Sequence, residues 1–294
     1  MDPRDVDICF YHGNCHDGAL AAAIVKQKTN SECEFIPTWW ESLPAKPSFA
    51  GKNVLFVDLT PSPKVLAEVL AKARNVFIID HHESAHAILV TQMELSMLRF
   101  DVKECGASLA WKWIHGDDAP FPPLVRYIKA LDMFDWAELE ATDASARGLS
   151  RCIEQLVAPA VPDMEDALCR GEAFIDTMRA ALPVVDAIIE RQIDRCMGSV
   201  EYSVLKGADH IRIAVVNSQH FINHLAFRIY TNTSVHLVWV WYRHGSSQTT
   251  RIMLRSNGRF DCQQYALIYG GGGHSNAAMF SCKNETSMWS HLWI

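Results

Sequence analysis

The first 80 residues alternate between strand-like and helix-like runs, and this alternation restricts the fold more than any other feature of the sequence. The strand-like runs, rich in β-branched and aromatic residues, are DICFYH at 7–12, EFIPTW at 34–39, NVLFVD at 53–58 and NVFIID at 75–80. Helix-like stretches lie at 18–28 and 63–73. Strands that alternate with helices are typical of βαβ units around a parallel sheet. We therefore predict an α/β fold.

The rest of the chain predicts a second, different lobe. Helical patterns follow at 106–116 and 122–136, and a long one runs over 164–197, in which Pro183 predicts a break or kink. After Gly198 the pattern changes to strand-like runs with hairpin-scale connections and one short helix. A length of 294 residues also favours two domains. We expect a two-lobed protein: a parallel-sheet domain at 1–160, a helical connector at 161–200 and a smaller mixed-sheet α/β domain at 201–294.

Composition excludes several classes of protein. With 49% hydrophobic and 21% charged residues, the chain has ordinary globular usage and is neither disordered nor collagenous. No apolar run approaches the roughly 18 to 20 residues of a membrane span. The opening MDPRDVD leaves no room for a signal peptide, and the nine cysteines lack CxxC spacing, which favours reduced thiols. We expect a soluble cytoplasmic protein without a membrane partner.

The net charge of −7 hides an asymmetry between the two parts of the chain. Residues 1–200 contain 19 Lys and Arg against 30 Asp and Glu, whereas residues 201–294 contain 8 against 4. The acidic part favours metal binding, and the basic part favours an anionic ligand.

Polar groups that can bind metal stand where three of the four strand-like runs end. They are His12, Asp58 and Asp80, and the last is followed by His81 and His82. Ligands of parallel sheets collect at strand ends, so this coincidence predicts a site. Asp58 alone would more often be a turn residue, but the Asp80-His81-His82 triplet crowds three metal-competent groups into one corner.

Two further segments supply candidate ligands. The loop after the first strand contains Cys15, His16 and Asp17, and Asp132 lies at the end of a predicted helix. By itself Asp17 could be a helix cap, and Asp132 a solvated carboxylate. Imidazoles and carboxylates without paired thiolates suit Mn²⁺ or another divalent ion with mixed N/O preference, rather than a closed zinc site. Two such ions would generate hydroxide and neutralise a phosphoryl group under attack.

Four motifs, in order, resemble those of the DHH phosphoesterase superfamily. They are HGNCHDG, FVDLTP, IIDHHES and KALDMFDW, spanning residues 12–136. The C-terminal run at 251–280, RIMLRSNGRFDCQQYALIYGGGGHSNAAMF, resembles the DHH-associated domain of short-oligonucleotide exonucleases, bisphosphate nucleotide phosphatases and cyclic-dinucleotide phosphodiesterases. The resemblance covers nearly the whole chain.

The resemblance implies roles for the individual residues. Asp58 would bridge two ions; Asp17, His81 and Asp132 would join it around one ion, and His12 would hold the second. His82 would position phosphate or a neighbouring carboxylate, and Asp80 would orient the histidines. Many relatives have an acidic ligand where this chain has Cys15. Either the softer Cys15 replaces that ligand, His16 moves in, or the His12 site is weak, so one or two ions are expected.

The same resemblance implies a substrate-binding segment in the basic part. It would consist of Arg255, Ser256, the glycines Gly271, Gly272 and Gly273, and the neighbouring His274 and Asn276. Glycine amides can receive phosphate oxygens, and a guanidinium can clamp a phosphate. Without that resemblance, four glycines at 270–273 would indicate a flexible turn, and Arg255 an exposed edge-strand side chain.

These features together predict a metal-dependent phosphohydrolase. A metal-activated hydroxide would attack phosphorus in line, and short single-stranded nucleic acid or dinucleotides would be cleaved to mononucleotides. A 3′,5′-bisphosphonucleotide phosphatase and a cyclic-dinucleotide phosphodiesterase are alternatives with the same chemistry. From another class, the chain could be an inactive nucleotide-binding regulator. Pyrophosphatase action ranks below these, and a homodimer is compatible with the prediction.

Overall fold

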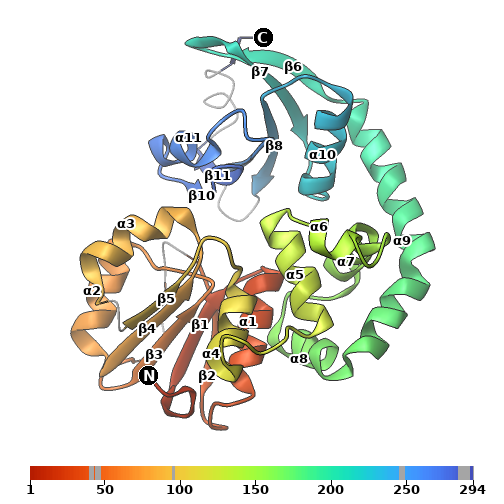
Figure 1. Ribbon diagram of the computed structural model, residues 1–294. Coiled ribbons are helices and arrows are strands. Elements are labelled where there is room, and N and C mark those ends of the chain that lie inside the picture. The colour runs from red at the N-terminus through yellow and green to blue at the C-terminus, as the bar shows by residue number, and fades with distance from the viewer. Residues whose placement is uncertain (40–42, 44–47, 95–96, 245–248, 284–291, 294) are drawn as a thin grey trace. The chain divides into compact units, whose positions relative to one another are not determined.

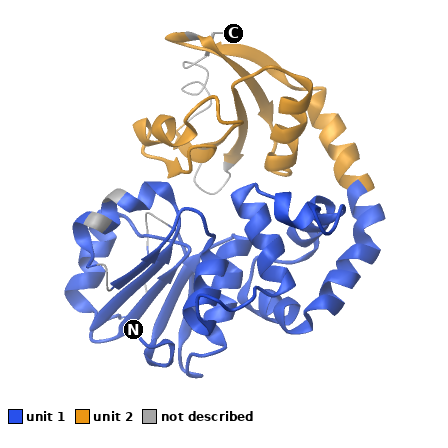
Figure 2. Cartoon of the chain, in the orientation of Figure 1, with its two compact units in different colours: residues 1–186 blue, residues 187–294 orange. Residues whose placement is uncertain are grey.

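The computed structural model describes residues 1–39, 43, 48–94, 97–244, 249–283 and 292–293. The chain divides into two compact units, residues 1–186 and 187–294 (Figure 2). The border lies inside one long helix, α9 (Glu172–Met197). It therefore falls within the segment at 161–200 where the sequence predicts a helical connector.

A five-stranded parallel sheet forms the centre of the first unit's described part (Figure 1). Its strand order is β2-β1-β3-β4-β5. The strands are β1 (Ile8–His12), β2 (Glu34–Thr38), β3 (Asn53–Val57), β4 (Asn75–Asp80) and β5 (Leu98–Phe100). The order reverses between β1 and β3, and at such a switch point the carboxyl ends of a doubly wound sheet bind ligands.

Alternate side chains of the central strands pack into two separate apolar layers. Cys9, Leu55 and Ile79 belong to the layer that includes α1 and α4. Phe10, Phe56 and Ile78 belong to the opposite layer, which includes α2 and α3. A strand buried on both faces needs an almost continuous apolar run, which is what the sequence shows. The predicted α/β fold is confirmed.

Helices cover both faces of this sheet (Figure 1). The described helices that precede α9 are α1 (His16–Lys26), α2 (Pro63–Lys72), α3 (Glu83–Gln92), α4 (Gly106–His115), α5 (Pro123–Met133), α6 (Ala137–Glu140), α7 (Ala146–Leu156) and α8 (Val161–Arg170), after a short 3₁₀ turn η1 (Pro3–Asp5). Within the described ranges, no helix has the length and apolarity that crossing a membrane requires.

The predicted break at Pro183 is wrong. Helix α9 is continuous through Pro183, and the interruption of the helical segment falls at Gly171 instead. Gly171 has φ +53° and ends α8, because a residue in this conformation cannot continue a right-handed helix. Pro183 removes one amide donor from a helix of 26 residues, and the helix tolerates that loss.

The second unit contains a mixed sheet of seven strands among the described residues. Its order is β10-β11-β9-β8-β7-β6-β12, and β7 and β8 are parallel whereas the other pairs are antiparallel. The strands are β6 (Glu201–Leu205), β7 (Ala208–Asn217), β8 (Leu237–His244), β9 (Thr249–Ser256), β10 (Gly272–Gly273), β11 (Ala277–Cys282) and β12 (Leu292–Trp293). Helices α10 (Ile222–Asn232) and α11 (Cys262–Ile268) accompany them. The predicted mixed-sheet α/β lobe is confirmed.

Candidate metal centre

The carboxyl ends of three adjacent strands bring the first candidate residues together. Tyr11 of β1 pairs with Val57 of β3, which pairs with Ile79 of β4. The next residue on each strand is therefore His12, Asp58 or Asp80. Because the strands are parallel and in register, three polar groups far apart in sequence emerge at one edge of the sheet.

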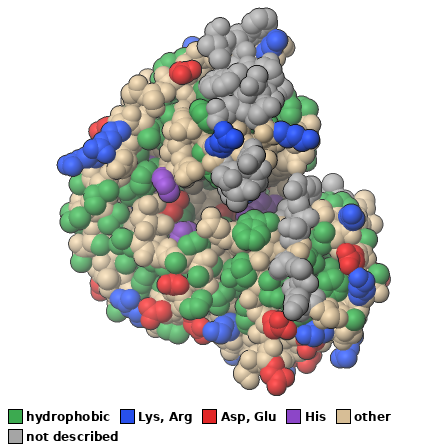
Figure 3. Space-filling view, turned by 180° about the vertical axis from the view of Figure 1, so that it is seen from behind, with side chains coloured by type: hydrophobic (Ala, Val, Ile, Leu, Met, Phe, Trp, Pro, Cys, Tyr) green, Lys and Arg blue, Asp and Glu red, His purple; other side chains and the backbone are tan. Residues whose placement is uncertain are grey.

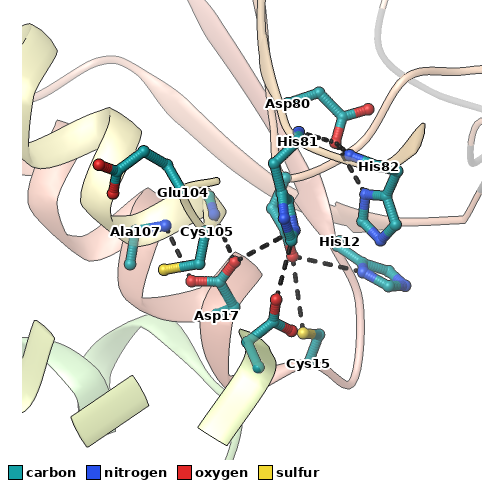
Figure 4. Close-up of polar contacts among 12 residues, drawn as sticks. His12, Cys15, Asp17, Asp80, His81, His82, Glu104, Cys105 and Ala107 are labelled. Atoms are coloured by element: carbon teal, nitrogen blue, oxygen red, sulfur yellow. Dashed lines mark hydrogen bonds and ion pairs between the residues drawn. The ribbon is translucent and has the colours of Figure 1, made fainter. Parts of the chain in front are cut away.

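Asp58 contacts residues from three segments at this edge, and Figure 4 shows His12, Cys15 and His81 there. Its Oδ1 is 3.1 Å from Nε2 of His81, and its Oδ2 is 3.4 Å from Nδ1 of His12. The Cys15 thiol donates to the same Oδ2 at 3.6 Å. Asp58 has φ +57°, a left-handed conformation that costs a non-glycine residue about 1–3 kcal/mol and concentrates at functional sites.

His81 brings two more carboxylates to the cluster. Its Nε2 lies 3.7 Å from Oδ2 of Asp17 and 3.5 Å from Oδ2 of Asp132, and its side chain is fully buried. The donor atoms of Asp17, His81 and Asp132 all lie within 4.8 Å of one another, and so do those of His12, Cys15 and Asp58. All six predicted metal ligands are thus gathered in two adjoining groups within the first unit.

Asp80 contacts the two histidines that follow it, through the His81 backbone amide and the His82 ring. Its Oδ1 accepts the His81 amide at 2.8 Å and lies 2.8 Å from Nδ1 of His82, and its Oδ2 accepts the Thr60 hydroxyl at 2.6 Å. Burial would raise the pKa of Asp80, but the positive charge and hydrogen bond of His82 outweigh burial and lower it. An ionised Asp80 holds the His82 ring by Nδ1, so Nε2 is directed away from Asp80.

The start of α4 grips Asp17, a contact that sequence reasoning did not anticipate. The Gly106 amide donates to Oδ2 of Asp17 at 2.5 Å, and the Ala107 amide donates to Oδ1 at 2.8 Å. A Cβ at Gly106 would lie 2.5 Å from Cβ of Asp58. Glycine is needed here because helix and ligands approach so closely. The signal was the Gly-Ala pair that opens the predicted helix at 106–116.

His16 faces away from the candidate ligands. Its Nε2 lies 2.8 Å from the carbonyl oxygen of Val157, whereas Cys15 contacts Asp58. Of the alternatives for this loop, the geometry therefore favours Cys15 in the ligand position. The following Gly18 lets α1 begin against β1, because a Cβ there would lie 2.5 Å from the His12 carbonyl oxygen.

The buried charges perturb one another strongly. Burial would raise the pKa of Asp58, but the nearby imidazoles of His12 and His81 outweigh burial and hold that pKa well below its usual range. Burial, together with repulsion from Asp58, raises the pKa of both Asp17 and Asp132. Burial also raises the pKa of the Cys15 thiol. Such a cluster retains protons that a divalent cation would displace.

The donor set fits a divalent cation. Among the residues that the structure describes, Nδ1 of His12 and Oδ2 of Asp132 are buried without a hydrogen-bond partner. Buried polar atoms normally have a hydrogen-bond partner, and these two lie in a cluster that contains three carboxylates. Imidazole and carboxylate donors match divalent ions of intermediate hardness, and one thiol adds a softer donor.

The predicted substrate residues lie in the second unit. Arg255 and Ser256 end β9, next to β11: Arg255 pairs with Ala277, and the Ser256 amide donates to the Asn276 carbonyl at 2.9 Å. The Arg255 guanidinium donates to Oδ1 of Asn223 at 2.8 Å. The structure thus brings the Arg-Ser segment and the His-Ser-Asn segment side by side.

The glycine run is part of the sheet. Gly272 and Gly273 form β10 and pair with Met279 and Ala278 of β11, while the Gly271 amide donates to Ala266. His274 closes a tight turn through its amide, which donates to the Ala277 carbonyl at 2.8 Å. Part of the glycine run is therefore a regular strand, held by pairing with β11.

Comparisons with known proteins were made on sequence and on structure. No family model matches the chain. Uncharacterized protein R106 of Acanthamoeba polyphaga mimivirus is 24% identical over 309 aligned positions, which cover 93% of this chain and 66% of R106. The chain thus spans about two thirds of the length of that relative.

Two solved structures resemble the chain along most of its length. One is a DHH domain from a member of the s1p family of ribosomal proteins, with 13% identity, a TM-score of 0.52 and coverage of 94% of this chain and 83% of that one. The other is a pGpG-specific phosphodiesterase from Vibrio, with 12% identity, a TM-score of 0.49 and coverage of 97% and 96%. The chain therefore has the fold of a DHH-domain structure, and it carries the Asp80-His81-His82 triplet at the carboxyl end of β4.

Proposed function

We propose that this chain is a metal-dependent phosphohydrolase that cleaves short oligonucleotides or dinucleotides to mononucleotides. Hydrolysis adds water across a P–O ester bond, leaving phosphate on one product and a hydroxyl on the other. The observation that carries the proposal is the convergence of His12, Asp58 and His81 with three further donors at the switch point of a parallel sheet.

The chain's own residues divide the work at this site. Asp17, His81 and Asp132 would hold one ion, His12 and Cys15 a second, and Asp58 lies between the two groups. When bound, divalent cations acidify water and neutralise charge on a phosphoryl group, and Mn²⁺ suits these donors. Asp17 is fixed by the two amides at the start of α4, so it needs little reorganisation to receive a cation.

His82 is the residue best placed to handle a proton. Asp80 accepts a hydrogen bond from Nδ1, and burial, which alone would lower the pKa of His82, is outweighed by the charge of Asp80, so the pKa is raised. A protonated His82 could donate from Nε2 to a phosphate or leaving-group oxygen. Asp80 itself acts by orienting and charging that ring.

The charge distribution supports a short, anionic substrate. Residues 201–294 contain 8 Lys and Arg against 4 Asp and Glu, and Arg255 pairs with Ala277, next to Asn276, in that unit. Figure 3 shows Lys and Arg side chains scattered in small groups over one face, without a continuous basic band among the described residues of that face. An enzyme that tracks long duplex needs such a band.

Product analysis tests the proposal. The purified chain with added Mn²⁺ would be incubated with pApA, pAp, cyclic dinucleotides, pyrophosphate and a longer single strand, beside an Asp58→Ala control. We expect mononucleotides from pApA at the highest rate and none from the control. Preferred hydrolysis of pAp or of a cyclic dinucleotide would reassign the substrate. Nucleotide binding without any turnover would identify a regulator.

A further inference from the structure

Glu104, the residue two positions before α4, joins two helices of the first unit. Its side chain is only 11% exposed and accepts three hydrogen bonds. The donors are the Ser108 hydroxyl at 2.7 Å, the Lys112 ammonium at 2.6 Å and the Lys129 ammonium at 2.6 Å. Ser108 and Lys112 belong to α4, whereas Lys129 belongs to α5. One carboxylate therefore binds both helices.

Neighbouring contacts make this junction rigid. The Ser108 hydroxyl that donates to Glu104 also accepts the Cys105 amide at 3.0 Å, which orders the first turn of α4. Both lysine ammonium groups lie over the ring of Phe121, at 5.7 Å for Lys112 and 5.5 Å for Lys129. Charge-assisted hydrogen bonds in a half-buried setting are stronger than neutral ones and hold their geometry.

Each of the two helices positions a different carboxylate of the metal centre. Helix α4 binds Asp17 through the amides of Gly106 and Ala107, and Figure 4 shows Ala107 beside Asp17. Helix α5 carries Asp132 three residues after Lys129, about one turn along the helix. Asp17 and Asp132 lie 3.7 Å and 3.5 Å from the same His81 nitrogen. The distance between α4 and α5 therefore sets the separation of these two carboxylates.

We infer that Glu104 is a positioning residue for the metal centre, and that it fixes Asp17 and Asp132 at the separation a cation requires. Glu104 contacts neither carboxylate and acts through α4 and α5. This role deepens the proposed function, since it assumes that the cluster binds a divalent ion. The pair of Glu140 with Arg147, by contrast, lies on α6 and α7, which carry none of the candidate ligands.

Mn²⁺ titration of the full chain tests this inference without any substrate. Two variants remove the charge of Glu104 or only its link to α5: Glu104→Gln and Lys129→Met. We expect each to weaken Mn²⁺ binding about 10- to 100-fold, the usual effect of losing a group that orients metal ligands. Binding would be followed by the electron paramagnetic resonance of free Mn²⁺, and thermal unfolding would be measured with chelator present.

Controls separate positioning from general stability. Glu140→Gln removes the charge of an acid that pairs with Arg147 in the same unit. This variant should leave the affinity for Mn²⁺ unchanged. The double variant Glu104→Gln with Lys129→Met should bind Mn²⁺ about as weakly as the weaker single variant, because both act on one link. If Glu104→Gln and Lys129→Met unfold at a lower temperature but bind Mn²⁺ like the wild type, the positioning role of Glu104 is wrong while the proposed function stands. A wild-type chain that binds no divalent ion would overturn the proposed function as well.

Discussion

The two units hold their candidate residues in different ways. In the first unit, side chains on β1, directly after β3 and β4, and on α1 and α5 contact one another around Asp58 and His81. In the second unit, the candidate residues are bound largely by their own sheet and by α10, as when Arg255 donates to Asn223. The first arrangement has strained backbone and crowded charge, which are the marks of a site that needs a cation. The second is an ordered surface on which a ligand must compete with existing hydrogen bonds.

The largest expected effect tests the first unit. Asp58→Asn keeps the shape of the side chain but removes the negative charge that contacts His81 in one ligand group and His12 in the other. Loss of several kcal/mol of charge stabilisation should lower Mn²⁺-dependent hydrolysis by about 10³-fold. Steady-state kinetics would measure it, with Asp135→Asn, an exposed acid beyond the end of α5, as the matched control. Wild-type turnover by Asp58→Asn would show that the cluster does not carry the reaction.

A smaller effect is expected in the second unit. Arg255→Lys keeps the charge but loses the guanidinium fork, so KM should rise about tenfold while Mn²⁺ affinity stays the same. Arg251→Lys is the matched control, because Arg251 lies on the same strand four residues earlier. If Arg255→Lys changed kcat and Mn²⁺ affinity instead, the division of labour between the units would be wrong.

Metal preference sharpens the comparison within the first unit. Cys15→Asp replaces a soft donor with a hard one next to Asp58, so the ratio of Cd²⁺ to Mn²⁺ affinity should fall about tenfold. Competition binding of the two ions measures this ratio. Cys169→Ser, which changes an exposed thiol elsewhere in the unit, should leave the ratio as it is. An unchanged ratio in Cys15→Asp would remove Cys15 from the ligand set.

The smallest effect concerns stability rather than activity. The Arg179 guanidinium donates to Asp143 at 3.0 Å and, with Ser145, lowers the pKa of that carboxyl below its usual value. A depressed pKa contributes stability above the unfolded pKa, and that stability is lost as the pH falls through the folded value. Asp143→Asn should lower the free energy of unfolding at pH 7 by about 1 kcal/mol. Urea unfolding at pH 7 and at acid pH would measure this, and the difference in the free energy of unfolding between the wild type and Asp143→Asn should be smaller at acid pH.

An exposed pair provides the comparison for that measurement. Asp166 and Arg170 are 3.4 Å apart with Asp166 68% exposed, and Asp166→Asn should change stability little at any pH. Equal effects of the two substitutions would mean that the Asp143 contacts contribute nothing specific.

Several site residues follow from local pattern, whereas others required the fold. His12, Asp58 and Asp80 could be found because they follow apolar runs whose length and composition are those of buried parallel strands. The contact between Asp17 and α4 could not be found, since it depends on how a helix 89 residues later in the chain packs against α1. The role inferred for Glu104 could not be predicted either. Its lysine partners lie 8 and 25 residues later in the chain, on two different helices, and no local sequence pattern links them.

The helical connector shows the opposite error. Pro183 looks decisive in the sequence, but a single lost hydrogen bond in a long helix is a modest local cost, and α9 continues through it. The helix end at Gly171 was not predicted from the sequence, yet the positive φ of this glycine ends α8.

By itself, the sequence determined the α/β class, the two-lobed order of elements and the chemical types of the metal donors, because strand and helix periodicity and residue chemistry are local properties. Only the tertiary structure decided which donors share a group, which loop residue faces Asp58, and how α4 and α5 hold Asp17 and Asp132. Those arrangements arise from packing between segments distant in sequence, where a displacement of an ångström separates a ligand from a bystander.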